Sequence, residues 1–175
     1  EDITHSGTGR FTWLMMRPMS LYESGESSGE VSLKDLFNKP DKITGISEHN
    51  IDDLTFLICR GGWPHAIGMK EKAALSQAED YYDAVVKSDI NRADGVNKNP
   101  ERVKRLMRSF ARNQGAQIGY TTLRDDIQAN DTGSLNEDTV ASYVNALKKI
   151  FVIEDMPAWN PNLRSKTPIR SADTR

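Results

Sequence analysis

Apolar side chains recur every three or four positions between residues 50 and 151, which is the spacing of one face of an α-helix. The pattern predicts helices over residues 50–60, 70–87, 100–114, 122–129 and 136–150. In the first of them the shared apolar face consists of Ile51, Leu54, Leu57 and Ile58. This stretch is therefore expected to be almost entirely helical.

Residues that favour helix ends support these limits. Asn50 is a good N-cap, and Asn99 followed by Pro100 is a second helix start, because proline is tolerated at the first helical position. Ser134 and Glu137 have the spacing of a capping box for the last helix. The chain is thus predicted to be mainly α.

The regions outside the helices predict two extended segments. Residues 10–21 alternate partly and carry aromatic side chains, so they predict a strand that ends near Pro18. The polar stretch ESGESSGE that follows indicates a loop or linker, and residues 153–159 look extended. We expect that Phe151, just before them, faces inward. The predicted division is 1–22, 23–49, 50–98 and 99–175.

The last of these parts has the order helix, short helix, turn, helix, strand. That order predicts a winged-helix-like domain, a helix-turn-helix with the beginning of a wing. The helix that starts near Asn136 would face a groove, but Glu137 and Asp138 in its first turn would be repelled by phosphates. A packing module is therefore favoured over DNA recognition. The candidate nucleic-acid contacts are Lys148, Lys149, Arg164, Lys166 and Arg170.

Charge and composition restrict the possible partners. With 23 basic and 25 acidic side chains, the net charge of -2 provides no overall field for nucleic acid or an anionic membrane. No apolar run approaches the ~18 residues of a membrane helix, so a soluble, cytoplasmic protein is expected. The one cysteine, Cys59, lies in an apolar run and is expected to be a buried structural thiol.

The sequence contains no pattern that indicates catalysis. The three histidines have no ligand-like spacing, so no metal site is predicted, and neither a phosphate-binding loop nor a nucleophile elbow occurs. The most unusual local motif is Gly61-Gly62-Trp63-Pro64, where two glycines allow a close backbone approach and the proline defines the following turn. The motif is explained either by a nearby ligand or, more simply, by a helix C-cap and turn.

Three stretches together resemble one family. They are HSGTGRFTWLMMRPMSLYESGESSG, RGGWP, and RSFARNQG followed by DTVASYVNALKKIFVIEDMPAWNPNLRSK. These stretches are similar to prokaryotic ATPases in which an AAA-type domain precedes a C-terminal domain of unknown function. The resemblance extends over nearly the whole chain and in the same order.

The resemblance implies a role for each part. Residues 1–22 would be the end of the ATPase core, with its last strand severed from the α/β sheet, and 50–98 would be a helical lid. ATP and Mg²⁺ would be bound by motifs upstream of Glu1. Arg10 would present a cation to nucleotide phosphates, and Gly61, Gly62 and Pro64 would lie near the adenine.

Three functions remain open. The leading one is a non-catalytic lid and winged-helix portion of an AAA-type ATPase, which couples nucleotide state to a protein or nucleic-acid partner. The second is a stand-alone winged-helix DNA-binding regulator, and the third is a protein-interaction adaptor that offers IEDMPAW as an added strand. The expected partners include the ATPase core, and a second copy through the exposed N-terminal strand.

Overall fold

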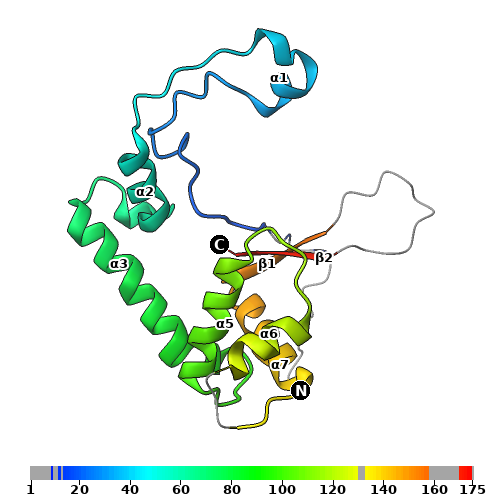
Figure 1. Ribbon diagram of the computed structural model, residues 1–175. Helices are drawn as coiled ribbons and strands as arrows, with labels where there is room; N and C mark the ends of the chain where they lie inside the picture. The colour runs from blue at the N-terminus through cyan, green and yellow to red at the C-terminus, as the bar shows by residue number, and fades with distance from the viewer. Residues whose placement is uncertain (1–8, 10–11, 13, 130–132, 158–169, 175) are drawn as a thin grey trace. The chain divides into compact units, whose positions relative to one another are not determined.

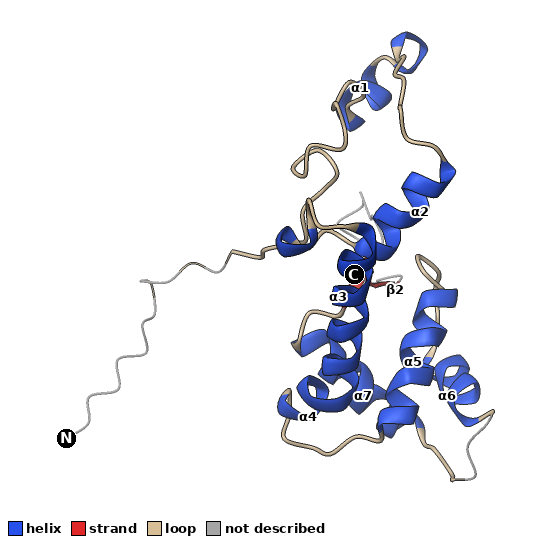
Figure 2. Cartoon of the chain, turned by 90° about the vertical axis from the view of Figure 1, so that its left-hand side faces the viewer, coloured by secondary structure: helices blue, strands red, loops and turns tan. Residues whose placement is uncertain are grey.

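The computed structural model describes residues 9, 12, 14–129, 133–157 and 170–174. These residues are mainly helical (Figure 2). The chain divides into two compact units, residues 1–79 and 80–175. The boundary falls inside one long helix, α3.

The first unit contains short helices joined by irregular chain. Its elements are α1 (Leu33–Asn38), the 3-10 turn η1 (Pro40–Lys42), α2 (Ile51–Arg60), the 3-10 turn η2 (Pro64–Ala66) and the first part of α3 (Glu71–Ala84). The buried apolar side chains described in this unit belong to Leu57, Ala66 and Ala74. A core of this size is small, so polar contacts contribute much of what holds these elements together.

The second unit contains most of the remaining secondary structure (Figure 1). Its elements are the end of α3, the π-helical turn η3 (Val85–Asp89), α4 (Ile90–Arg92), α5 (Pro100–Arg112), α6 (Tyr120–Gln128), α7 (Glu137–Lys149), β1 (Ile153–Pro157) and β2 (Arg170–Thr174). α5 packs on α6, and α6 packs on α7. The helices therefore surround one core.

Apolar side chains of η3, α4, α5, α6, α7 and β1 form that core. Its members are Val85, Val86, Ile90, Val103, Leu106, Phe110, Leu123, Ile127, Leu135, Val140, Tyr143, Val144, Ala146, Leu147, Val152 and Ile153. On α5 and α7 these positions follow the three-to-four spacing, because only one face of each helix points inward. The three-to-four apolar spacing that predicts these two helices is thus the spacing of their buried faces, with Phe151 as the exception.

Two of the predicted helix caps are present. The Asn50 side chain accepts hydrogen bonds from the backbone N–H groups of Asp52 and Asp53. The Asp53 carboxylate in turn accepts one from the backbone N–H of Asn50, so the capping box of α2 is complete. Asn99 likewise accepts from the backbone of Glu101 at 2.9 Å. Both helices therefore begin where the sequence predicts.

The start of α7 differs from the prediction. Its N-cap is Asn136, whose side-chain oxygen accepts a 2.8 Å hydrogen bond from the backbone N–H of Thr139, so the predicted pair of Ser134 and Glu137 is wrong. Asparagine is as good an N-cap as serine, and it stands two residues closer to the first helical turn. Phe151 also differs, since it has a positive φ of 60° and its side chain is 60% exposed.

The prediction of an N-terminal strand is wrong for the residues that the structure describes. Residues 12 and 14–20 form no strand, and a turn follows at residues 21–25. A backbone hydrogen bond from the Met19 N–H to the Gly62 carbonyl, at 2.8 Å, ties this segment to the turn after α2. A strand needs a partner along its length, and here none of the described residues provides it. Self-association through this segment stays a prediction.

The apolar face of α2 is largely exposed. Leu57 is buried, whereas Ile51 and Ile58 are 74% and 80% exposed and Leu54 is 38% exposed. Cys59 is exposed as well, so it is not the buried thiol that was expected. The side of α2 that packs within its own unit carries Arg60 instead, because this arginine has a partly buried acidic partner, Glu26.

The extended segment after α7 forms half of a two-stranded antiparallel sheet. Residues Ile153 and Thr174 pair at one end, and Pro157 and Arg170 at the other. The prediction of extended chain is confirmed up to Pro157, and residues 158–159 lie outside the described part. One edge of β1 is thus already paired with β2, so the strand addition of an adaptor would have to use the other edge.

Candidate functional site

The Gly61-Gly62-Trp63-Pro64 motif ends α2 and begins the next turn. Gly61 is the C-cap with φ 72°, and its N–H donates to the Leu57 carbonyl at 3.0 Å. A left-handed C-cap is a position that glycine adopts without steric cost. Pro64 opens η2, whose last residue Ala66 is almost fully buried. The cap and turn that were the simpler interpretation are both present.

Gly62 has a different reason to be a glycine. A side-chain carbon at this position would lie 2.2 Å from the carbonyl oxygen of Met19. The close approach that the motif predicted is therefore made by the protein's own backbone. A nucleotide near Gly61, Gly62 and Pro64 remains a prediction.

Arg60, directly before this motif, is the most buried cation among the described residues of the first unit. Its guanidinium forms a two-pronged ion pair with Glu26, in which Nη2 lies 2.9 Å from Oε2, and its Nε donates to the Gly61 carbonyl at 3.1 Å. The side chain of Arg60 is 4% exposed and that of Glu26 is 22% exposed. The pair anchors the polar turn around Glu26 on α2.

The charges of this pair stabilise each other. Hydrogen bonds from Arg60 lower the pKa of Glu26 to about 2, and the carboxylate raises the pKa of Arg60 in turn. His49 adds a further contact, since its Nε2 lies 2.7 Å from the Glu26 carbonyl oxygen. No local sequence pattern reveals this cluster, because Arg60 and His49 lie 34 and 23 positions from Glu26.

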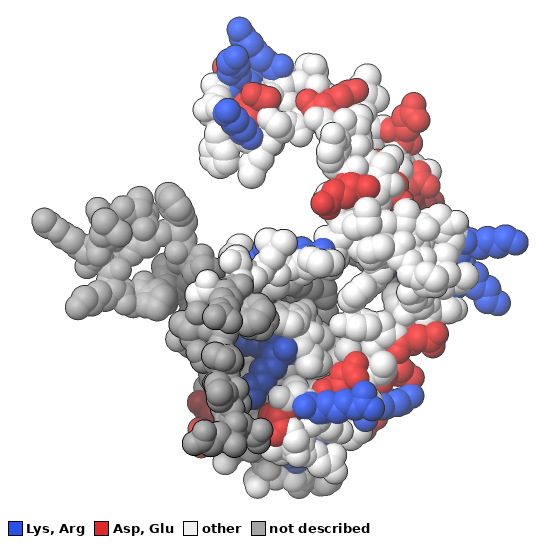
Figure 3. Space-filling model, turned by 180° about the vertical axis from the view of Figure 1, so that it is seen from behind, with Lys and Arg blue, Asp and Glu red and all other residues white. Residues whose placement is uncertain are grey.

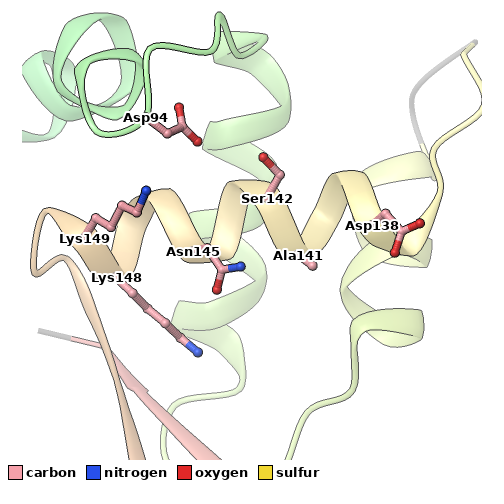
Figure 4. A pocket seen from close by; sticks show the side chains of 7 residues that line it. All are labelled: Asp94, Asp138, Ala141, Ser142, Asn145, Lys148 and Lys149. Carbon is pink, nitrogen blue, oxygen red and sulfur yellow. The ribbon is translucent and has the colours of Figure 1, made fainter.

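The second candidate site is a shallow depression of about 600 Å³ along the exposed face of α7 (Figure 4). Its lining residues are Asp94, Asp138, Ala141, Ser142, Asn145, Lys148 and Lys149. Except for Asp94, all of them are on α7 and share one face through the spacings of three and four. This is the face that the sequence predicts for a groove-facing helix, and its lining includes both Lys148 and Lys149.

The charge on this face changes sign along the helix. Glu137 and Asp138 occupy its first turn, and Lys148 and Lys149 its last. Lys148 already forms an ion pair with Asp155 of β1, at 2.7 Å. Small polar and apolar side chains, Ser142 and Ala141 among them, lie between the two ends (Figure 4). This face of α7 can therefore bind a partner surface that carries charges of both signs. The side chains at the centre of the face are small, so they would not obstruct such a partner.

A buried lysine supports the edge of this depression. Lys98 is completely buried, and its Nζ lies 2.6 Å and 2.7 Å from the two carboxylate oxygens of Asp94. The same Nζ is 5.9 Å from the centre of the Tyr143 ring. The hydrogen bond from Lys98 is the main reason that the pKa of Asp94 is lowered. Asp94 is thus held as a carboxylate in one orientation.

The other predicted contact residues are Arg10, Arg164, Lys166 and Arg170. Arg10, Arg164 and Lys166 lie outside the described residues, and Arg170 is described only as the first residue of β2. On the face that Figure 3 shows, acidic and basic side chains of the described residues are interspersed. A continuous basic surface is not visible there among those residues.

Two further properties concern metal binding and membranes. The described residues contain no group of three or more His, Cys, Asp or Glu side chains that could hold a metal ion. Among the helices within the described ranges, none combines the length and apolar character that crossing a bilayer requires.

Comparison with known proteins places most of the chain in one family. Residues 51–173 match a family described as "Domain of unknown function (DUF8612)". The match begins at the first residue of α2 and ends within β2. No curated protein and no solved structure matches the chain significantly.

Proposed function

Because the chain belongs to the DUF8612 family, whose description names no activity, we propose its function from its geometry and from its resemblance to AAA-type ATPases. It is the lid and winged-helix portion of such an ATPase in the cytoplasm. It performs no chemistry itself, and it couples the nucleotide state of the ATPase core to a protein partner that docks on α7.

The observation that carries this proposal is the order of elements in the second unit. α5, α6 and α7 pack in sequence around one core, and the antiparallel pair of β1 and β2 follows α7. Three helices followed by a two-stranded wing is the arrangement of winged-helix domains, in which the third helix is the one offered to a partner. The depression of Figure 4 lies on that third helix.

The charges of α7 favour a protein over DNA as the partner. Recognition helices usually approach base edges with their N-terminal residues, and here Glu137 and Asp138 would meet phosphates. Lys148 is engaged by Asp155, which reduces the positive charge left at the other end. A protein surface with charges of both signs suits this face better.

DNA binding is the second candidate because basic residues continue beyond α7. Lys149 is exposed, and Arg164, Lys166, Arg170 and Arg175 follow in the sequence. Fluorescence anisotropy with a labelled duplex of about 30 base pairs would detect such binding. We expect no saturable change in anisotropy at 50 mM salt. Tight binding that weakens steeply with salt would favour the DNA-binding regulator instead.

ATP and Mg²⁺ belong to the ATPase core in this proposal. The chain carries no phosphate-binding loop, and its described residues hold no acidic cluster suited to Mg²⁺. The residues present therefore do not form a nucleotide site alone. Arg10 would act only after joining the core, where its cation would face the phosphates.

The coding sequence upstream of Glu1 tests the proposal directly. A phosphate-binding loop, followed by a strand that ends in acidic residues, is the expected finding. A start codon immediately before Glu1 would overturn the link to an ATPase. A matched biochemical test uses the purified 175-residue chain, which should show no ATP hydrolysis above buffer.

A further inference from the structure

A cavity of about 320 Å³ in the second unit takes no part in the function proposed above. It lies between the end of α3, one face of α5 and the start of β1. Its lining residues are Tyr82, Met107, Arg108, Phe110, Ala111, Val152 and Ile153. Figure 1 shows α5 beside the strands.

The interior of this cavity is apolar. Phe110 and Ile153 are each 3% exposed and Val152 is 7% exposed, so they belong to the core and cannot move far. Tyr82 and Met107 are more accessible and line its sides. The binding free energy of a ligand in this cavity would come mainly from the removal of the ligand's apolar surface from water.

Arg108 is the charged group of the lining, and it makes no ion pair or hydrogen bond with any described residue. Its neighbours one turn away on α5 differ from it in this respect. Lys104 pairs with Glu101 at 3.0 Å, and Arg112 pairs with Asp126 at 3.0 Å. The carboxylate of Asp83, the residue after Tyr82 in the sequence, forms an ion pair with Lys87. Arg108 is therefore an uncompensated cation at the edge of an apolar cavity.

We propose that this cavity binds a small amphiphilic anion, whose apolar body contacts Phe110, Val152 and Ile153 and whose acidic group meets Arg108. A guanidinium binds a carboxylate or sulfonate through two parallel hydrogen bonds. A volume of about 320 Å³ is at the small end of ligand pockets, so one fused ring system or a short acyl chain fits. This proposal does not depend on the link to an ATPase.

The experiment uses two fluorescent probes of nearly the same shape, the anionic 1-anilinonaphthalene-8-sulfonate and the neutral N-phenyl-1-naphthylamine. Each is titrated into the 175-residue chain, and the dissociation constant is obtained from the emission. We expect both probes to bind at one site. Arg108→Gln should weaken the anionic probe about 3- to 10-fold and leave the neutral one unchanged.

Arg112→Gln is the matched control, because it removes the same cation one turn further along α5, outside the cavity. It should leave both dissociation constants unchanged. Ala111→Trp should fill the cavity and abolish binding of both probes, with circular dichroism and the thermal midpoint showing that the variant is folded. Equal weakening by Arg108→Gln and Arg112→Gln would overturn the charge assignment. Unchanged binding to a folded Ala111→Trp variant would overturn the site.

Discussion

The backbone N–H of Asn99 donates a 2.8 Å hydrogen bond to the hydroxyl oxygen of Tyr143, 44 residues later in the chain. Asn99 is the N-cap of α5, and Tyr143 is a core residue in the middle of α7. The start of one helix is thus held by the interior of another. This contact positions α7 and the face that we propose for partner docking.

Removing the Tyr143 hydroxyl should destabilise the second unit. Tyr143→Phe leaves the Asn99 N–H without its acceptor while keeping the ring, so the free energy of unfolding should fall by about 1–2 kcal/mol. Urea denaturation followed by circular dichroism measures the change. Tyr22→Phe is the control. The Tyr22 side chain is 67% exposed, so removing its hydroxyl should leave the free energy of unfolding nearly unchanged.

The buried pair of Lys98 and Asp94 predicts an asymmetry between two substitutions. Asp94→Asn removes the charge that compensates a completely buried lysine, so the free energy of unfolding should fall by roughly 3 kcal/mol. Lys98→Met leaves the Asp94 carboxylate without its partner, but this carboxylate is more accessible to water than Lys98. The free energy of unfolding should therefore fall by less than in Asp94→Asn. Asp83→Asn breaks an exposed pair with Lys87, so it should leave the free energy of unfolding nearly unchanged. Equal effects of Asp94→Asn and Asp83→Asn would contradict the importance of burial.

The Glu26–Arg60 pair predicts acid sensitivity of the first unit. The folded pKa of Glu26 is lowered to about 2 from an ordinary 4.5, so its contribution to stability is complete above about pH 4.5. That contribution is lost as the pH falls toward 2, when the carboxylate takes up a proton. Carbon-13 NMR of the Glu26 carboxyl follows the titration. Arg60→Gln should return its pKa toward 4.5, and an unshifted pKa in that variant would exclude Arg60 as the cause.

Adjacent glycines should respond differently to alanine. Gly62→Ala places a carbon 2.2 Å from the Met19 carbonyl oxygen, so the backbone of residue 19 must move and the 2.8 Å hydrogen bond is lost. Gly61→Ala meets its nearest atom only at 3.4 Å and is opposed mainly by its positive φ, a cost of about 1 kcal/mol. Hydrogen exchange of the Met19 amide should accelerate in Gly62→Ala and change less in Gly61→Ala.

Local signals explain which parts of this fold were predictable. The caps at Asn50 and Asn99 and the inward faces of α5 and α7 depend on residues three or four positions apart, so sequence spacing reveals them. The exposed face of α7 was predicted for the same reason. The cap predicted at Ser134 is wrong because Asn136 offers an equivalent oxygen two residues away, and spacing alone does not distinguish the two.

The sequence by itself determined the mainly helical character, most helix limits and the helix that presents Lys148 and Lys149, since each follows from periodicity and capping within a few residues. Only the tertiary structure decided that Arg60 is buried on Glu26, that Gly62 meets Met19 and that Lys98 lies under Tyr143. It also decided that Cys59 is exposed and that residues 14–20 form no strand. These outcomes depend on which distant segments meet, and a charge or an apolar side chain is buried only where such a partner compensates for the loss of water.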